Sequence, residues 1–225
     1  MQKLFRKLRI YTRIKRIIKA LIGYVVPPKY IIWQGRLSAK RIALTFDDGP
    51  NAEFTEKTLE ILKRYDVKAT FFLLGEELEK FPELVKCIVE QGHAIGNHLY
   101  THSHIRQMRI ENFISEIEKT QIKIEEFYKN RIKLFRSPYC ELSLPALLFA
   151  VKKGYTFIMY SIETNDFMHK NAEDIISEIN AQEIEPGDIL LFHDNNRGTV
   201  AALPSIIDNL QKRGFEFVKV SELIK

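Results

Sequence analysis

Short apolar runs alternate with amphipathic segments along most of the chain. The runs are rich in β-branched and aromatic residues, as buried strands are, and the intervening segments repeat apolar residues at helical spacing. This pattern predicts strands over residues 41–46, 67–74, 93–97, 132–136, 155–162, 188–193 and 215–220. It predicts helices over 54–65, 82–91, 110–128, 144–153, 172–182 and 199–213. Alternating strands and helices imply an α/β fold with a parallel sheet, either doubly wound and open or closed into a β/α barrel.

Chemically reactive side chains follow the ends of five of these predicted strands. They are Asp47 and Asp48, His98 and His102, Arg136, Asp166, and His193. In a β/α barrel the carboxyl ends of all strands converge on one face, where barrel active sites lie. An open sheet spreads its strand ends along a line and uses mainly those that flank one crevice. The distribution therefore favours a barrel.

The first 22 residues follow a different pattern. Apolar residues recur at steps of three and four from Leu4 to Leu21, and four arginines occupy another face. This predicts a basic amphipathic helix of the kind that lies on anionic membrane surfaces. The apolar stretch 20–26 is too short to span a membrane. Pro27-Pro28 marks a boundary between an N-terminal segment, 1–28, and a single domain, 29–225.

Charge is distributed unevenly along the chain. The total is +5, but the first 20 residues hold eight basic and no acidic side chains, so the other 205 hold 26 basic and 29 acidic residues. A slightly acidic body argues against a nucleic-acid partner. We expect a cytoplasmic protein that is peripheral on the inner face of the membrane. The sequence leaves open an export signal or membrane anchor, and a segment that is packed on the body or disordered.

Composition limits the kinds of site that the chain can build. The 45% apolar and 28% charged residues are typical of a globular protein, which excludes a disordered or low-complexity chain. Two cysteines cannot form a disulfide framework or a four-cysteine zinc site. Histidine and carboxylate ligands remain, and Asp48, His98 and His102 form a plausible two-histidine, one-carboxylate set with open positions for water and substrate. A lone His-x-x-x-His pattern is more often structural, and the neighbouring His93 and His104 weaken the signal further. The set indicates a metal site more specifically when it is taken together with Asp47 and with the position of these residues at strand ends.

Five segments, read in order, carry a more specific signal. They are Thr45–Pro50 (TFDDGP), His98–His102 (HLYTH), Arg136–Tyr139 (RSPY), Glu163–Phe167 (ETNDF) and Leu191–His193 (LFH). This series resembles the polysaccharide deacetylase family, the NodB-homology domain of carbohydrate esterases, over residues 40–225. The resemblance implies a single-domain, distorted (β/α)7 barrel. It also implies metal-dependent removal of an N-acetyl or similar N-acyl group from an amino sugar.

The resemblance assigns a role to each matching position. It implies a divalent metal, most often zinc with cobalt or manganese as alternatives, held by Asp48, His98 and His102. It implies a catalytic pair and the residues that orient the pair: Asp47 as base with Arg136, and His193 as acid with Asp166. It implies a pocket formed by the oxyanion-hole N–H of Tyr139 and by the apolar walls of Leu191 and Phe167. The chemistry agrees, because amide hydrolysis needs a Lewis acid, a base for water and an acid for the leaving amine.

The sequence departs from the family pattern at four positions. Leu99 replaces the usual Ser or Thr after the first histidine, and Cys140 replaces a frequent glycine. Glu163 and Phe167 replace the usual Asp and Trp of the fourth segment. The residues assigned to metal, base, acid and their partners are all present. We therefore expect the four changes to alter metal affinity, cleft width or the pocket wall rather than to abolish the activity.

Several alternatives remain at this level. The substrate is an N-acylated sugar of a wall glycan if the protein is exported, or a lipid-linked saccharide if it works at the cytoplasmic face. A non-catalytic carbohydrate-binding barrel is the main competing class. Phosphoryl transfer at the Asp-Asp-Gly turn is disfavoured because no glycine-rich phosphate loop is present.

Overall fold

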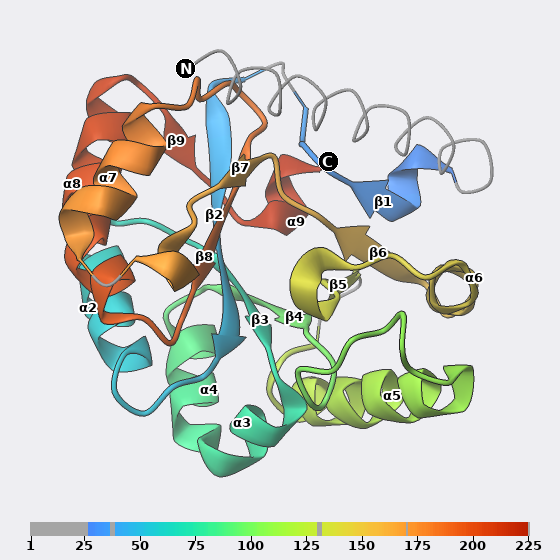
Figure 1. Ribbon diagram of the computed structural model, residues 1–225. Helices are drawn as coiled ribbons and strands as arrows, with labels where there is room; N and C mark the ends of the chain where they lie inside the picture. Colours follow the sequence, from blue (N-terminus) through green and yellow to red (C-terminus); the bar gives the residue numbers. More distant parts are fainter. Residues whose placement is uncertain (1–26, 37–38, 130–131, 170, 225) are drawn as a thin grey trace.

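The computed structural model describes residues 27–36, 39–129, 132–169 and 171–224. Their strands form one parallel sheet that curves around a central core (Figure 1). In spatial order the strands are β1 (Ile31–Ile32), β6 (Tyr155–Ile158), β5 (Lys133–Phe135), β4 (Ala94–Asn97), β3 (Thr70–Leu73), β2 (Arg41–Gly49), β8 (Ile189–His193) and β7 (Ile162–Glu163). A short strand, β9 (Glu216–Phe217), pairs with the beginning of β2. Within these ranges no strand pairing joins β1 to β7, so the barrel is distorted and open on one side, which confirms the predicted fold class.

Helices cover the outside of the curved sheet (Figure 1). They are α2 (Thr55–Arg64), α3 (Gly75–Lys80), α4 (Pro82–Glu90), α5 (Ile110–Phe127), α6 (Leu144–Lys152), α7 (Ala172–Asn180) and α8 (Arg197–Lys212). The short helix α9 (Val220–Leu223) instead packs against the inner face of the sheet, in one cluster with Ala43 and Phe72. Helix α5 shows how the apolar spacing acts, because Phe113, Ile117 and Ile124 are buried while charged residues lie between them. Each such helix buries one apolar stripe and leaves its charged face in water.

Aromatic and aliphatic side chains fill the space between the sheet and the helices. Phe46 of β2 stacks on Phe71 of β3 and on Phe192 of β8, with ring centroids 5.0 and 5.8 Å apart. These strands are buried on both faces and therefore read as continuous apolar runs rather than as alternating ones. A rigid core below the carboxyl ends of β2, β3 and β8 fixes the polar residues that follow.

The structure corrects several predicted boundaries. The run 155–162 is two strands, because the chain leaves β6 at residue 159 and crosses to the other edge of the sheet. In this crossing Met159 N donates to Ile32 O of β1, and Ser161 N donates to Ile189 O of β8. The run 215–220 forms only β9, and the following residues begin α9. The pattern also missed β1 and α3, each too short to show a period.

The predicted amphipathic helix over residues 1–22 lies outside the described residues, and the boundary at residue 28 stays a prediction. Within the described ranges, we find no helix with the length and apolar content that a membrane crossing requires.

Candidate active site

Three metal-ligating side chains meet at the carboxyl ends of β2 and β4. Asp48 Oδ1 lies 3.4 Å from His98 Nε2 and 3.3 Å from His102 Nε2. The register between β2 and β3 shifts between Asp47 and Gly49, and Asp48 takes a φ of 71°. In a regular strand the side chains of two consecutive residues point to opposite faces, so one of the two aspartates would point away from the site. The bulge changes the direction of Asp48, so both side chains reach the site.

The state of these three side chains fits a divalent cation. Asp48 Oδ1 is buried and has no hydrogen-bond partner. Burial raises the pKa of Asp48, but the nearby imidazoles of His98, His193 and His102 outweigh it and lower the pKa to about 2. Burial also holds the pKa of His102 below its usual 6.5. An ionised carboxylate and neutral imidazoles are the forms that bind metals.

A backbone contact fixes the tautomer of His98. Its Nδ1 lies 2.7 Å from the carbonyl oxygen of Arg136, so Nδ1 carries the proton and donates it. The lone pair of Nε2 is therefore directed at Asp48 and the shared ligand position. Metal-binding histidines are usually held in this way by a second partner on the other nitrogen.

Asp47 lies beside this set and is held by a buried guanidinium. Arg136 Nη1 donates to Asp47 Oδ1 at 2.8 Å and to Thr45 Oγ1 at 2.7 Å. Its other nitrogens donate to the carbonyls of Ile158 and Met159 at 3.0 and 3.1 Å, where the chain leaves β6. Each of the three guanidinium nitrogens of Arg136 thus donates at least one hydrogen bond, which compensates for the complete burial of its charge.

His193 is the register partner of Asp47 on the neighbouring strand β8. Its Nδ1 lies 2.7 Å from Asp166 Oδ1, while Asp166 Oδ2 accepts from His193 N and from Thr199 Oγ1. Burial lowers the pKa of His193, but the hydrogen bond and charge of Asp166, with Asp47 and Asp48, raise it to about 9. The imidazole is therefore protonated at neutral pH, and Nε2 is the nitrogen left for a ligand.

A cavity of about 870 Å³ opens over these groups. Its walls include Tyr139, Cys140, Phe167 and Leu191, together with the metal set, Asp47 and His193. Phe167 is 59% exposed and meets the His193 ring edge-on at 5.6 Å, and Tyr139 is 56% exposed. The cavity thus has a polar floor and two exposed aromatic side chains at its rim.

The site residues predicted from sequence all converge on this cavity or directly behind it. Arg136 and Asp166 are fully buried and contact Asp47 and His193, respectively. Leu99, which departs from the family pattern, is buried in the apolar core with a φ of 67°. His93, flanking the predicted set, is also a core residue: Ala69 N donates to its Nδ1 and its ring meets Phe71 edge-on.

Sequence reasoning missed the polar residues that support the site from behind. Thr199 in the first turn of α8 binds Asp166, and Asn195 Nδ2 donates to Asp48 Oδ2 at 3.2 Å. Asp194 N donates to the carbonyl of Asp47, which joins the loops after β2 and β8. Their only signal in the sequence is the run of polar residues after His193, which is equally typical of a helix start.

Comparison with known proteins identifies the family. The polysaccharide deacetylase family model matches residues 34–158. A peptidoglycan-N-acetylglucosamine deacetylase of Bacillus cereus is 36% identical over 197 residues, which are 86% of this chain and 71% of that protein. The chain belongs to the polysaccharide deacetylase family. It is thus a homologue of metal-dependent deacetylases that retains an Asp-His-His metal-binding set.

Other members of the polysaccharide deacetylase family show how far the likeness extends. A Listeria monocytogenes peptidoglycan-N-acetylglucosamine deacetylase is 35% identical over 82% of this chain, which spans 39% of that protein. The crystal structure of a peptidoglycan N-acetylglucosamine deacetylase in complex with 4-naphthalen-1-yl-N-oxidanyl-benzamide has a TM-score of 0.84 and 34% identity, covering 90% of this chain and 95% of that one. A pseudoenzyme from Bacillus anthracis has a TM-score of 0.81 and 27% identity, covering 88% and 69%. Family membership therefore leaves the question of activity to the site itself.

Proposed function

We propose that the protein hydrolyses the N-acetyl group of an N-acetylglucosamine unit in peptidoglycan. The observation that carries this proposal is the pair Asp47 and His193 on neighbouring strands, one held by Arg136 and the other by Asp166, beside a complete metal-binding set. Amide hydrolysis needs one group that takes a proton and one that gives a proton, on two sides of the same carbonyl.

The charges on the two residues suit these opposite roles. Asp47 receives a hydrogen bond from Arg136 at Oδ1, which leaves Oδ2 to accept a proton from the attacking water. His193 is protonated below about pH 9, so its Nε2 can donate a proton to the amine nitrogen as the C–N bond breaks. Water thus supplies the hydroxyl group of the acetic acid that is released. Asp47 has then gained one proton and His193 has lost one, so the transfer of one proton from Asp47 to His193 through solvent restores both residues.

Asp48, His98 and His102 would hold the divalent cation, for which we propose zinc, with cobalt and manganese as alternatives. When bound, the cation supplies Lewis-acid polarisation of the amide carbonyl and lowers the pKa of a water molecule. We assign the backbone N–H of Tyr139 to the developing oxyanion, where a preorganised donor is most effective. Leu191 and Phe167 form the apolar walls that receive the acetyl methyl and exclude water from it.

Peptidoglycan as the substrate is supported by the named activities of the relatives in Bacillus cereus and Listeria monocytogenes. The open cavity with aromatic rims also suits an internal unit of a polymer. The alternative is a non-catalytic carbohydrate-binding barrel, which the Bacillus anthracis pseudoenzyme makes a concrete possibility within this fold.

An acetate-release assay on the zinc-, cobalt- and manganese-loaded protein tests the proposal. Peptidoglycan fragments, chitooligosaccharides and polyprenyl-linked amino sugars are compared, and Asp47→Asn is the inactive control. We expect release from peptidoglycan fragments by the wild type and a loss of at least about 100-fold in Asp47→Asn. No acetate from any substrate, with metal confirmed in the protein and glycan still bound, would establish the binding barrel instead.

We further propose that residues 1–22 attach the protein to an anionic membrane surface. Attachment at the cytoplasmic face would imply a lipid-linked saccharide as the substrate, whereas peptidoglycan as the substrate implies an exported protein. The support is the basic amphipathic pattern of that segment. An electrostatic attachment is released at high salt, because salt screens exposed charges. Fractionation of cells at about 0.05 and 1 M salt, with a protease-accessibility assay from each side, therefore separates this arrangement from an exported or anchored protein.

A further inference from the structure

Two consecutive residues without glycine's freedom adopt left-handed backbone conformations in the cavity wall. Tyr139 has a φ of 56° and Cys140 a φ of 48°. In this region the Cβ atom crowds the following carbonyl, so only glycine enters it without a free-energy cost. Such a conformation persists only where neighbouring contacts enforce it. The turn also carries the Tyr139 N–H to which the proposed function assigns the oxyanion.

Contacts within the turn account for part of its stability. Cys140 N donates to Ser137 O at 2.9 Å, and Glu141 N donates to Pro138 O at 3.2 Å. Ser137 Oγ donates to the carbonyl of Glu141. These bonds close the turn on itself, but they do not fix its position relative to the metal-binding loop.

Glu141 joins the turn to the loop between β4 and α5. Its Oε1 lies 3.0 Å from His104 Nδ1, and its Oε2 accepts from Arg106 N at 3.2 Å. Arg106 Nε also donates to Leu142 O at 3.3 Å. Both carboxylate oxygens of Glu141 therefore contact the loop that also carries His102 of the metal-binding set.

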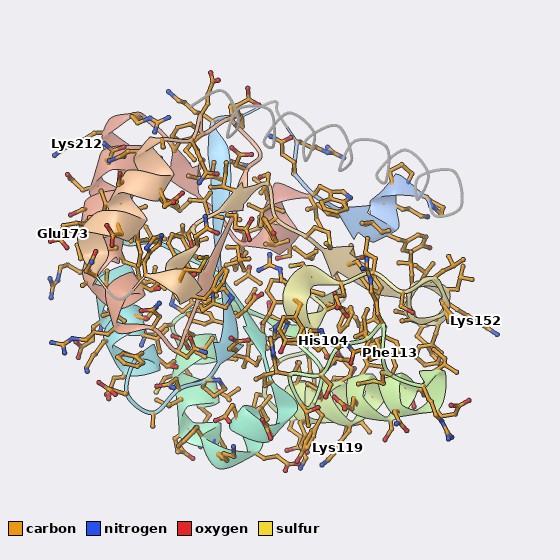
Figure 2. The ribbon with its side chains drawn as sticks, in the orientation of Figure 1. His104, Phe113, Lys119, Lys152, Glu173 and Lys212 are labelled. Atoms are coloured by element: carbon orange, nitrogen blue, oxygen red, sulfur yellow. The ribbon has the colours of Figure 1, made fainter. Side chains whose placement is uncertain are left out.

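His104 makes a second contact with the same turn. Its ring stacks on Tyr139 with centroids 3.8 Å apart and planes 9° from parallel, while His102 meets the other part of Tyr139 edge-on at 4.5 Å. Figure 2 shows His104 between the turn after β5 and helix α5. His104 thus binds Glu141 through its edge and Tyr139 through its face, so both contacts restrain one turn.

We propose that Glu141 and His104 are positioning residues that hold the Tyr139–Cys140 turn in its left-handed conformation and so aim the Tyr139 N–H at the reacting carbonyl. The inference rests on the proposed function. It explains how cysteine is tolerated where the family often has glycine, because this chain replaces backbone freedom with contacts from a neighbouring loop.

A rescue experiment tests the inference. Glu141→Ala removes both carboxylate contacts, and Glu141→Gln keeps an acceptor oxygen; exposed Glu60→Ala on α2 is the matched control. We expect kcat to fall by ~10- to 100-fold in Glu141→Ala with little change in KM, an intermediate effect in Glu141→Gln, and none in Glu60→Ala. In a Cys140→Gly background, Glu141→Ala should cost clearly less kcat than in the wild-type background, since glycine removes the cost at one of the two left-handed positions.

A merely structural role predicts a different result. Glu141→Ala would then lower the unfolding temperature but leave kcat of the folded protein within twofold of wild type, and Cys140→Gly would not reduce the penalty. Either outcome overturns the inference. An activity-independent readout is the upfield ring-current shift of the His104 imidazole protons, which should be lost in Glu141→Ala. Absence of activity in the wild type would count against the proposed function, whereas an active wild type with an unaffected Glu141→Ala counts against this inference alone.

Discussion

Arg136 Nη1 lies 2.8 Å from Asp47 Oδ1, and the guanidinium is fully buried between three further acceptors and the ring of Phe72. Removing one partner of a buried ion pair leaves the other charge without compensation, which costs about 3–5 kcal/mol. We expect Arg136→Met to lower the free energy of unfolding by about that amount, as measured by urea denaturation. Adding Asp47→Asn should recover part of the loss; a double variant as unstable as the sum of the two would show that the pair does not interact.

We expect the His193–Asp166 pair to set the alkaline limit of activity. Asp166 is the main cause that raises the pKa of His193 to about 9, so the acid form is present up to that pH. In Asp166→Asn the burial of His193 lowers its pKa instead, and the alkaline limb of the kcat/KM profile should move down by at least about 2 pH units. Identical profiles for the two proteins would exclude His193 as the acid.

The same pair links stability to pH. The pKa of His193 is higher in the folded state, about 9, than the ordinary 6.5 of an unfolded chain. The pair therefore stabilises the fold fully below about pH 6.5, and this contribution is lost as the pH rises through about 9. Chemical denaturation of the metal-free wild type and Asp166→Asn between pH 6 and 10 should show this slope in the wild type alone.

Loss of one ligand should abolish tight metal binding. Asp48→Asn removes the carboxylate that lies within 3.4 Å of both histidines, and we expect zinc affinity to fall by more than about 100-fold in a chelator-competition assay. Asp174→Asn, on the exposed side of α7, is the control. Zinc at about 100 times its Kd should stabilise the wild type by about 2.7 kcal/mol, and Asp48→Asn hardly at all. Equal zinc protection of both proteins would place the metal elsewhere.

Buried His93, which lies away from the active site, should make the stability of the fold sensitive to acid. Burial lowers its pKa to about 4, with the charges of Lys68 and Lys219 adding to the effect. The unfolded chain binds this proton near pH 6.5, so stability falls between pH 6.5 and 4, by about 3 kcal/mol in total. In His93→Gln, whose amide oxygen can still accept from Ala69 N, this part of the slope should vanish. A slope unchanged from the wild type would show that other groups cause acid unfolding.

Local pattern was enough for the elements that repeat. The long helices and the strands β2, β3, β4, β5 and β8 follow from apolar periods and from turns after each run, because a buried face must recur at the period of its element. The order of polar residues at strand ends was also sufficient to indicate a barrel face. Short elements such as β1 and α3, and the crossing at residues 159–161, were not predictable, since their geometry depends on partners that are distant in the sequence.

By itself the sequence determined which reactive residues gather at one site: Asp47, Asp48, His98, His102 and His193 follow strands whose ends must meet. Only the tertiary structure decided how they are charged and aimed. Arg136 reaches Asp47 because its guanidinium fills the gap where the chain leaves β6, and Thr199 reaches Asp166 because α8 begins beside it. The left-handed turn at Tyr139 likewise depends on Glu141 and His104 from two loops. The identities of the site residues can be read from short segments of the sequence. Their protonation and geometry cannot, because hydrogen bonds and desolvation come from residues that are close in space but distant in the chain.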